Sequence, residues 1–572
     1  MSEDQANINS ESKKQNQNDV LYGDFQKKFP KDKLRELTLE EYTNLKENDD
    51  DYFCRWVEQK LKSLGEIRGS NSLKFGIYRY NEFPKIKCQH DEMYAWRDDF
   101  GDNAKDAFEK IKQKLIEVVE AASQKDCVNY ESIEKNPLSE MFKWKIAFLY
   151  SDRRLVPIYS KKMLLDILKK CDISIPQGKT VAEIQKLLIE KKPSDEDIWK
   201  YTDSIWEKYY SEFPTKESPN VIFYGAPGTG KTYKVNEYLR TKYPDEKSFE
   251  EHVSWVQFHP NYSYEDFIEG IKPLGIDKKT NSIKLELVNG HFKDICIKAK
   301  HNPNNEYYFV ADEINRANLS AVFGETLSLI EASYRDDPNG ERHLLKKQYS
   351  EVEKNIHSEK SAEQSNSYNV KCYESDGRFG VPQNIRFIGM MNDVDKSIDA
   401  FDLALRRRFK WIRTDCNYGV IQDECDNGDS ILEGGDDFII ACARLNYFIS
   451  GIIPSADTQG IDEEKIKKVK DFIKKEDCLS LGSSYEFGHS IYMKIRNVCE
   501  SKQSKKIRNE DKTDLFDQYL LPTLKEYLRS YFPEEDLGIK IDEAKTIFLG
   551  TKKKKNNPNS SATEDLTDGQ PE

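Results

Sequence analysis

The segment GAPGTGKT, Gly225 to Thr232, constrains the fold of this chain more than any other stretch of its sequence. It matches the pattern GxxxxGK[ST], and it directly follows NVIFY, an apolar run that predicts a buried strand. Glycines in this pattern let backbone N–H groups turn toward phosphate oxygens where a helix begins. We expect Lys231 to reach the β- and γ-phosphates of a nucleotide and the Thr232 hydroxyl to hold Mg²⁺. The residues expected to bind the nucleotide are Gly225, Ala226, Pro227, Gly228, Thr229, Gly230, Lys231, Thr232 and Tyr233.

A second apolar run, YYFVADE, ends in two carboxylates, Asp312 and Glu313. In open α/β sheets, ligands bind at the carboxyl ends of the strands, which is where these side chains would stand. We expect Asp312 to order Mg²⁺ through water and Glu313 to polarise the attacking water as a general base.

A third run, NIRFIGMMN, predicts another strand of the same sheet and ends at Asn392. This amide could orient the attacking water or the γ-phosphate. Asp395 follows three residues later, close enough in sequence to support it. We therefore include Asn392 and Asp395 among the catalytic candidates.

Three adjacent cations, Arg406, Arg407 and Arg408, follow at the end of a short predicted helix. Neighbouring helical residues project about 100° apart, so all three cannot reach one phosphate. We expect Arg406 or Arg407 to act in trans on the γ-phosphate of a neighbouring subunit, since such arginines accelerate hydrolysis by roughly 10³ to 10⁵-fold in related chemistry. The alternative is a solvated helix end, where positive charge is favourable.

The pattern of the whole chain predicts an α/β core with a parallel sheet, followed by a helical lid and preceded by an α+β domain. In the first domain, LKFGIYRY, KWKIAFLY and SDRRLVPIYS predict strands, and AKDAFEKIKQKLIEVVEAA predicts a helix. A polar insertion should end in a hairpin at YNVKCYESDGRFG. The expected divisions are a disordered N-terminus (1–19), the α+β domain (20–200), the core (205–415, insertion 335–378), the lid (416–548) and a disordered tail (551–572).

Composition excludes several other classes of protein. The 572 residues have a formal net charge of −13, with 37% hydrophobic and 33% charged residues. No apolar run approaches the length of a membrane span, and the N-terminus lacks the apolar core of a signal peptide. The eleven cysteines form no CxxC pair, which favours a reducing cytoplasm over a disulfide framework or a zinc site.

Taken together, these motifs resemble the McrB family of AAA+ NTPases, the motor subunits of modification-dependent restriction systems. The resemblance covers about 205–530. It rests on DEINRANLSAVFGETLSLIE, on MNDVD as the family's MNxxD signature, and on QFHPNYSYEDFIEGIKP, FGVPQNIRFIG and YEFGHSIYM. It implies an AAA+ core, a ring that is often a hexamer, and GTP as substrate, although most AAA+ relatives use ATP. The chain departs from the family in having GMMN where GTMN is common, and in its long insertion.

The resemblance further implies that residues 20–200 recognise DNA, which is modified in such systems. Trp56, Tyr78, Trp96 and Trp144 could stack on a flipped base, and Lys74, Arg79, Lys143 and Lys145 could contact phosphates. The alternative for these side chains is an ordinary core and an ordinary solvated surface.

We find no clustered carboxylates of a nuclease outside the NTPase site. The chain is thus expected not to cut DNA itself, and an McrC-like nuclease subunit is the implied partner. Two other functions stay open at this point. One is an AAA+ chaperone of the MoxR or dynein-related type that remodels proteins with ATP, and the other is a binding module whose nucleotide site acts as a switch.

Overall fold

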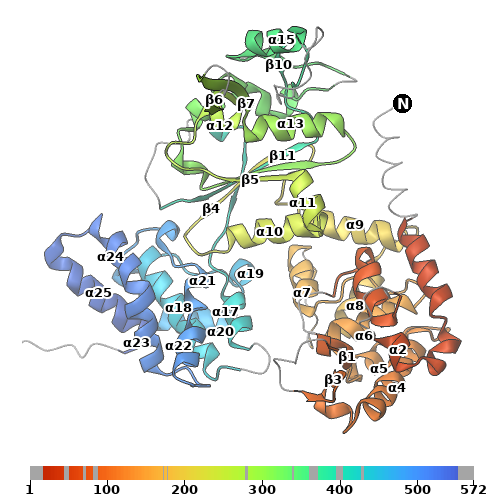
Figure 1. The fold of residues 1–572 in the computed structure, drawn as a ribbon. Helices are drawn as coiled ribbons and strands as arrows, with labels where there is room; N and C mark the ends of the chain where they lie inside the picture. The colour runs from red at the N-terminus through yellow and green to blue at the C-terminus, as the bar shows by residue number, and fades with distance from the viewer. Residues whose placement is uncertain are drawn as a thin grey trace, which may run out of the picture. The chain divides into compact units, whose positions relative to one another are not determined.

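The computed structural model describes residues 17–43, 51–67, 72–80, 88–171, 173–174, 176, 178, 180–276, 281–337, 340–359, 372–394, 403–426 and 431–551. The chain divides into two compact units, Met1–Ser211 and Glu212–Glu572 (Figure 1). The segments 1–16 and 552–572, which were predicted to be disordered, lie outside the described residues. Residues 17–19 begin a helix that continues to residue 28, so the prediction of disorder was wrong there. The helix forms because Tyr22 and Phe25 on one of its faces are buried in the core of the first unit.

The described residues of the first unit are mostly helical and form one small sheet. Its three short antiparallel strands lie in the order β1-β3-β2. The strands are β1 (Ile77–Arg79), β2 (Gln89–His90) and β3 (Tyr94–Trp96). The helices are α2 (Leu39–Tyr42), α3 (Phe53–Arg55), α4 (Ala104–Ala122), α5 (Tyr130–Lys135), α6 (Glu140–Leu149), α7 (Lys161–Lys170), α8 (Val181–Lys191) and α9 (Ile198–Tyr209).

Two strand predictions in this unit were wrong. KWKIAFLY belongs to helix α6, and SDRRLVPIYS forms no strand. The alternation of Lys143 and Lys145 with apolar residues resembled a strand with one wet face. Both lysines are in fact buried, and their ammonium groups donate hydrogen bonds to backbone carbonyls inside the unit. The helix predicted at AKDAFEKIKQKLIEVVEAA is confirmed as α4.

The second unit is built on a five-stranded parallel sheet in the order β12-β4-β11-β8-β5. The strands are β4 (Asn220–Gly225), β5 (Val253–Gln257), β8 (Tyr307–Asp312), β11 (Ile385–Asn392) and β12 (Lys410–Arg413). The helices of this part are α10 (Lys231–Lys242), α11 (Glu246–His252), α12 (Tyr264–Phe267), α13 (His291–His301), α14 (Leu319–Phe323), α15 (Ser350–Glu359) and α16 (Leu403–Arg406). The strands predicted at VIFY, YYFVA and NIRFIG are confirmed as β4, β8 and β11, and the parallel sheet is confirmed with them.

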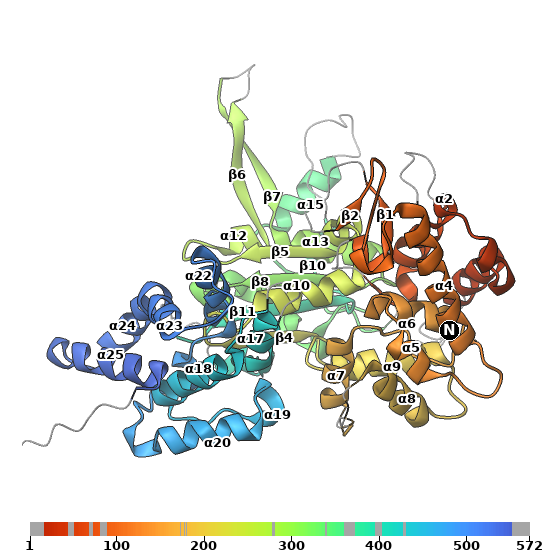
Figure 2. The same ribbon diagram turned by 90° about the horizontal axis from the view of Figure 1, so that it is seen from below.

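Two antiparallel pairs accompany this sheet. Strands β6 (Glu269–Ile276) and β7 (Ile283–Asn289) form a hairpin that extends away from it (Figure 2). Within the predicted insertion, β9 (Leu345–Lys346) pairs with β10 (Arg378–Phe379). The predicted hairpin at YNVKCYESDGRFG lies partly outside the described residues. Its described end pairs back to β9 instead of folding on itself.

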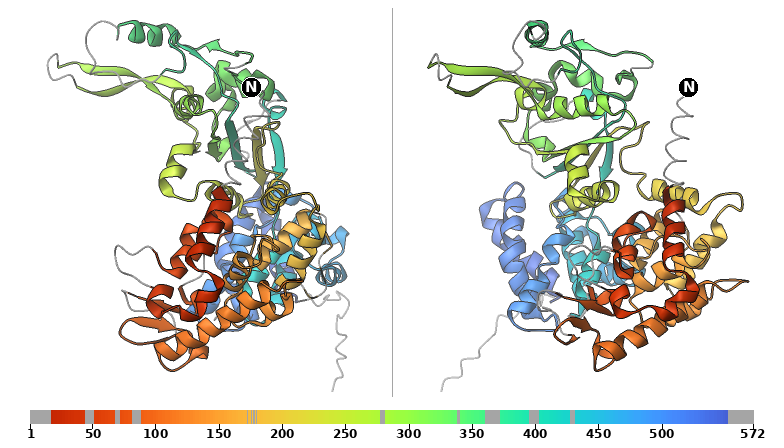
Figure 3. Two further views of the ribbon diagram at one scale, coloured as in Figure 1. Left: turned by 90° about the vertical axis from the view of Figure 1, so that its right-hand side faces the viewer. Right: turned by 45° about the vertical axis from the view of Figure 1, so that its right-hand side comes forward.

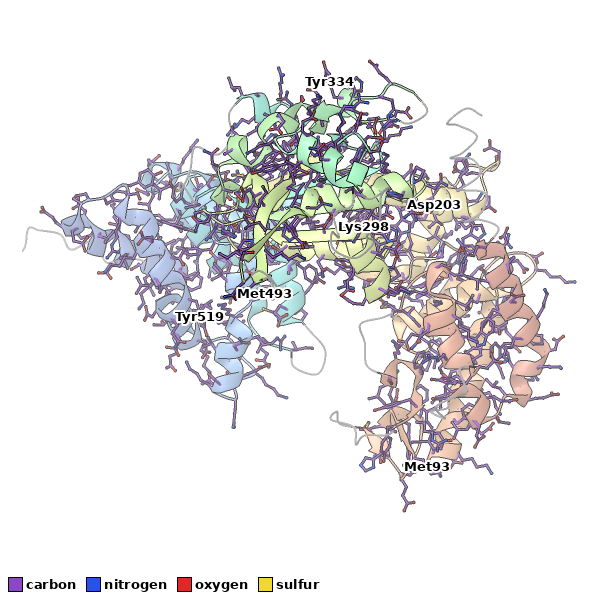
Figure 4. The ribbon with its side chains drawn as sticks, turned by 45° about the horizontal axis from the view of Figure 1, so that its top comes forward. Met93, Asp203, Lys298, Tyr334, Met493 and Tyr519 are labelled. Atoms are coloured by element: carbon purple, nitrogen blue, oxygen red, sulfur yellow. The ribbon has the colours of Figure 1, made fainter. Side chains whose placement is uncertain are left out.

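A bundle of helices after β12 forms the predicted lid, seen in blue in Figure 1 and in the right-hand view of Figure 3. Met493 and Tyr519, labelled in Figure 4, belong to this bundle. The helices are α17 (Tyr418–Cys425), α18 (Gly435–Ser450), α19 (Ala456–Gln459), α20 (Glu463–Phe472), α21 (His489–Tyr492), α22 (Ile495–Ser501), α23 (Asn509–Leu515), α24 (Leu521–Arg529) and α25 (Glu534–Leu549). Helix α18 is buried along most of its length and forms the centre of the bundle's core. Among the described residues, every helix is too short or too polar to span a lipid bilayer.

Candidate functional site

The phosphate loop connects the end of β4 to the start of α10 at the carboxyl edge of the sheet. Gly228 and Gly230 have φ angles of 78° and 76°, a region that residues with a Cβ rarely adopt. Gly230 is the residue before the first turn of α10, so the unpaired N–H groups of that turn face the space in front of the loop. This is the arrangement expected of a phosphate site.

Lys231 folds back over the loop. Its Nζ donates hydrogen bonds to the carbonyl oxygens of Gly225 at 3.0 Å and Ala226 at 2.9 Å. Burial lowers the pKa of Lys231 to about 8, and the negative charges of Asp393, Glu313 and Asp312 oppose that shift. A bound phosphate would add negative charge beside the ammonium group and favour its charged form.

Glu313 and Asn392 are brought together although one follows strand β8 and the other ends strand β11. Asn392 Nδ2 donates to Glu313 Oε1 at 2.8 Å. On the other side of the carboxylate, Arg316 Nε donates to Oε2 at 3.3 Å. The sheet register explains the meeting, because Asn392 ends β11 and Glu313 follows the end of the adjacent strand β8. Two of the sequence-predicted catalytic side chains are therefore in direct contact.

The oxygen donors at this edge suit Mg²⁺. Thr232 is exposed at the start of α10, and Asp312 ends β8, with burial raising the pKa of its carboxyl group. Mg²⁺ in NTPases uses one or two protein oxygens and takes its remaining ligands from phosphate and water. One hydroxyl and one carboxylate therefore fit the ion, and the described residues contain no richer cluster of metal-ligating side chains.

The arginines stand at the opposite edge of the sheet. Asn220, the first residue of β4, donates from Nδ2 to the Arg408 carbonyl at 3.0 Å, whereas the phosphate loop follows the last residue of β4. A strand of this length spans roughly 20 Å. The arginine triplet is thus separated from the phosphate loop of its own chain by the length of a strand.

The three arginine side chains differ in their surroundings. Arg408 is 10% exposed, and its Nη1 donates to the Ala404 carbonyl at 2.6 Å. The Arg406 guanidinium lies 5.3 Å from the centre of the Trp411 ring. Arg407 is exposed and lines an open cavity of about 400 Å³. Tyr334, at the outer end of this part in Figure 4, lines the same cavity. Of the three arginines, only Arg406 is helical, because α16 ends there.

Asp395, the remaining catalytic candidate, lies outside the described residues.

Several residues of this site were missed from the sequence. Asp393 follows Asn392 directly, and its Oδ2 accepts a hydrogen bond from Ser484 Oγ of the lid at 2.7 Å. Further along the same lid segment, the Gly488 and Ser490 N–H groups donate to the Pro227 and Gly228 carbonyls at 3.1 and 3.0 Å. A Cβ on Gly488 would come within 2.0 Å of the Gly228 backbone, so only glycine fits there. The motif YEFGHSIYM contained this contact, but nothing in its spacing pointed to the phosphate loop.

Five of the eight side chains proposed to contact DNA from the first unit are structural. Lys145 has no exposed surface, donates to the Leu61 and Gly65 carbonyls at 2.8 and 2.6 Å, and has a pKa that burial lowers to about 7. Lys143 donates to the Asn136 carbonyl at 3.0 Å, and Lys74 is buried against Glu58. The indoles of Trp96 and Trp144 are buried in the core. Of the eight candidates, those with accessible surface are Trp56, Tyr78 and Arg79.

Comparison with known proteins gives the family. Residues 220–409 match the model of the AAA domain of the dynein-related subfamily. The chain is 32% identical over 275 residues to the type IV methyl-directed restriction enzyme EcoKMcrB subunit of Escherichia coli (strain K12), covering 48% of this chain and 47% of that protein. It is 26% identical over 211 residues to the type II restriction enzyme BsuMI component YdiS of Bacillus subtilis (strain 168), covering 34% of this chain and 56% of that protein.

The chain therefore spans about half the length of these curated relatives. A solved structure of a candidate ATPase from Cytophaga hutchinsonii aligns with 67% of this chain and 93% of its own, at 11% identity and a TM-score of 0.18. The two curated relatives are components of restriction enzymes, so the protein-remodelling alternative is not favoured. The predicted family is confirmed by these matches: the chain is a McrB-like AAA+ protein.

Proposed function

We propose that this chain hydrolyses a nucleoside triphosphate, GTP or ATP, at the edge of the sheet where β4, β8 and β11 end. The observation that carries the proposal is the convergence of the phosphate loop, Lys231, Glu313 and Asn392 from three strands. Lys231 would hold the terminal phosphates, Glu313 would accept a proton from the attacking water, and Asn392 would orient that water. Thr232, and Asp312 through water, would hold Mg²⁺, which neutralises phosphate charge when it is bound.

Turnover is proposed to need a ring, with a hexamer as the expected form. The support comes from the arginine triplet, which lies a strand's length from the phosphate loop of its own chain. An arginine in that position can stabilise a transition state only in a neighbouring subunit. Arg407 fits best, because Arg408 is buried against its own backbone and Arg406 packs on Trp411.

The ring is proposed to act as a DNA-recognising motor of a restriction system in the cytoplasm. The support is the likeness to two restriction-enzyme components. The first unit would recognise modified DNA, hydrolysis would drive movement along it, and an McrC-like nuclease subunit would cut. A separate nuclease is part of the proposal because both curated relatives are components of restriction enzymes.

Phosphate release tests the hydrolytic part of this proposal. Purified chain would be incubated with Mg²⁺ and either GTP or ATP, in separate tubes and over a range of protein concentrations. Phosphate release per chain should rise at the protein concentrations where sedimentation detects assembly. Lys231→Ala should abolish phosphate release. Equal release by wild type and Lys231→Ala would show that another site, or a contaminant, hydrolyses the nucleotide.

A further inference from the structure

The carboxylate of Asp393 connects three segments that approach the phosphate loop. Its Oδ2 accepts hydrogen bonds from Ser484 Oγ at 2.7 Å and from Arg413 Nη1 at 3.3 Å. Its backbone N–H donates to the Gly225 carbonyl at 3.4 Å. The side chain is 12% exposed. Asp393 thus contacts the first residue of the phosphate loop, the end of β12 and the lid, while lying between the motif residues of the MNxxD signature.

The lid segment Ser484–Ser490 is fixed at both of its ends. At one end, Ser484 is bonded to Asp393. At the other end, the N–H groups of Gly488 and Ser490 donate to carbonyls of the phosphate loop. The lid segment therefore contacts the place where phosphates would bind and, separately, the residue that follows Asn392.

The charges around Asp393 make it sensitive to a nearby anion. Its negative charge is the strongest of those that favour the charged form of Lys231 against the effect of burial. Arg413 lies on its other side and is also paired with Asp415, at 2.7 Å. The second oxygen of Asp393, Oδ1, is buried and has no hydrogen-bond partner among the described residues. A γ-phosphate at Lys231 would compete with this carboxylate for the ammonium group and would repel it.

We propose that Asp393 is a positioning residue that couples the presence of a γ-phosphate in the phosphate loop to the position of the lid segment Ser484–Ser490. The phosphate's negative charge displaces the carboxylate, and the hydrogen bond to Ser484 transmits that displacement to the lid. The lid then differs between the triphosphate and diphosphate states. This inference rests on the proposed function, because it requires a nucleotide at Lys231.

The test uses the full chain and the variants Asp393→Asn, Ser484→Ala and the double variant, with Asp415→Asn as the matched control. Asp415 also pairs with Arg413, but it has no bond to Ser484. Two quantities are measured: the affinity for fluorescent GTPγS, ATPγS, GDP and ADP analogues, and hydrogen–deuterium exchange of 484–490 in each nucleotide state. Thermal melting verifies that each variant folds, and Asp393→Ser replaces Asp393→Asn should the latter not fold.

In the wild type, hydrogen–deuterium exchange of residues 484–490 should differ between the triphosphate-bound and the diphosphate-bound chain. Asp393→Asn should bind the triphosphate analogue at least about threefold more tightly, since a like charge is removed, and should lose the difference in exchange. Ser484→Ala should keep wild-type affinity and lose only the difference in exchange, and the double variant should match Asp393→Asn. Asp415→Asn should behave as the wild type in both measurements.

Wild-type affinity in Asp393→Asn, or a persisting exchange difference in that variant, would overturn the coupling while leaving hydrolysis intact. If the wild-type chain binds neither GTPγS nor ATPγS more tightly than Lys231→Ala does, the proposed function and the coupling are overturned together.

Discussion

Glu313 is held on both sides in this structure. Asn392 bonds one carboxylate oxygen and Arg316 the other. The backbone of Glu313 has a φ of 51°, which is uncommon for a residue other than glycine and is often found where function requires strain. The sharp turn directs the carboxylate toward Asn392 and away from the continuation of β8.

The first prediction separates binding from chemistry. Glu313→Gln should bind nucleotide and assemble normally but turn over about 10² to 10⁴-fold more slowly, because only water activation is lost. Lys231→Ala should weaken binding itself, since the cationic contact to phosphate is removed. Fluorescent-nucleotide titration and phosphate release distinguish the two effects. Wild-type turnover in Glu313→Gln would exclude it as the general base.

A second prediction concerns Glu486, which is 5% exposed beside Asp415 and Asp393. Burial raises its pKa from 4.5 to about 7. The folded state therefore favours the protonated form of Glu486. Its contribution to the free energy of unfolding is fully present below pH 4.5 and is lost as pH rises through about 7.

Glu486→Gln should remove that pH dependence. The variant should gain up to about 3 kcal/mol relative to wild type at pH 8 and little at pH 5, a difference that follows from 1.36 kcal/mol per pKa unit. Melting temperature measured against pH tests this expectation. Parallel profiles for wild type and variant would show that Glu486 is not the titrating group.

At the scale of elements, the turn between α16 and β12 presents Arg407 at the edge of the sheet remote from the phosphate loop. Arg407→Ala should lower turnover in the assembled ring by at least about tenfold, because the charge of the transition state loses its partner. Nucleotide binding by single chains should stay normal. Arg406→Ala is the matched control and should have a smaller effect, since Arg406 packs on Trp411.

Mixing variants tests whether Arg407 acts in trans. Arg407→Ala retains an intact phosphate loop, and Lys231→Ala retains an intact Arg407, so mixed rings should regain activity that neither variant has alone. If mixed rings assemble but hydrolyse nucleotide no faster than either variant alone, Arg407 does not act in trans, and the arginine triplet is only a solvated helix end.

The insertion is fastened to the core by four buried charges. Lys293 pairs with Glu269 at 2.5 Å and with Glu353 at 3.0 Å, and Lys347 pairs with the same two carboxylates. All four side chains are fully buried. Glu353→Ala should therefore cost about 3 to 5 kcal/mol of stability, since two buried ammonium groups lose a partner. Calorimetry measures this loss, and exposed Glu351→Ala is the control. Equal melting of the two variants would contradict the anchoring role.

Sequence patterns predicted those elements whose periodicity was unambiguous. The apolar runs of β4, β8 and β11 and the helical spacing of α4 are confirmed. Short β5 and β12 were not predicted, because partly exposed strands have no continuous apolar run. Helix α6 was mistaken for a strand because its buried lysines look polar in sequence although their stems and ammonium groups lie inside.

The candidate site was predictable to the same degree. Asp312, Glu313 and Asn392 stand at the ends of recognisable strands, and Lys231 begins the helix that follows β4, so topology alone brings them to one edge. Asp393, Arg413 and Ser484 could not be predicted together. Their contact depends on how the lid packs against the sheet, and that packing joins residues far apart in the sequence.

The chain has two compact units, and the proposed function assigns recognition to the first and hydrolysis to the second. In the first unit, Trp56, Tyr78 and Arg79 are the candidates with accessible surface for contacting DNA, whereas Trp144 is core. Arg79→Ala should weaken binding of modified duplex with little loss of folding, because the Arg79 side chain is only partly buried at the end of β1, and Trp144→Ala should unfold the unit. Gel-shift assays with modified and plain duplex, together with circular dichroism, test the pair. Indifference of the wild type to both duplexes would remove DNA recognition from the account.

The most direct measurement follows modified plasmid and phosphate release in the same tube, with Mg²⁺ and GTP or ATP, with and without an McrC-like nuclease subunit. We expect cleavage only when wild-type chain, triphosphate and the nuclease subunit are all present, and we expect none with Glu313→Gln. Cleavage by this chain alone, or cleavage at the wild-type rate when Glu313→Gln replaces it, would contradict an NTP-driven motor that depends on a separate nuclease.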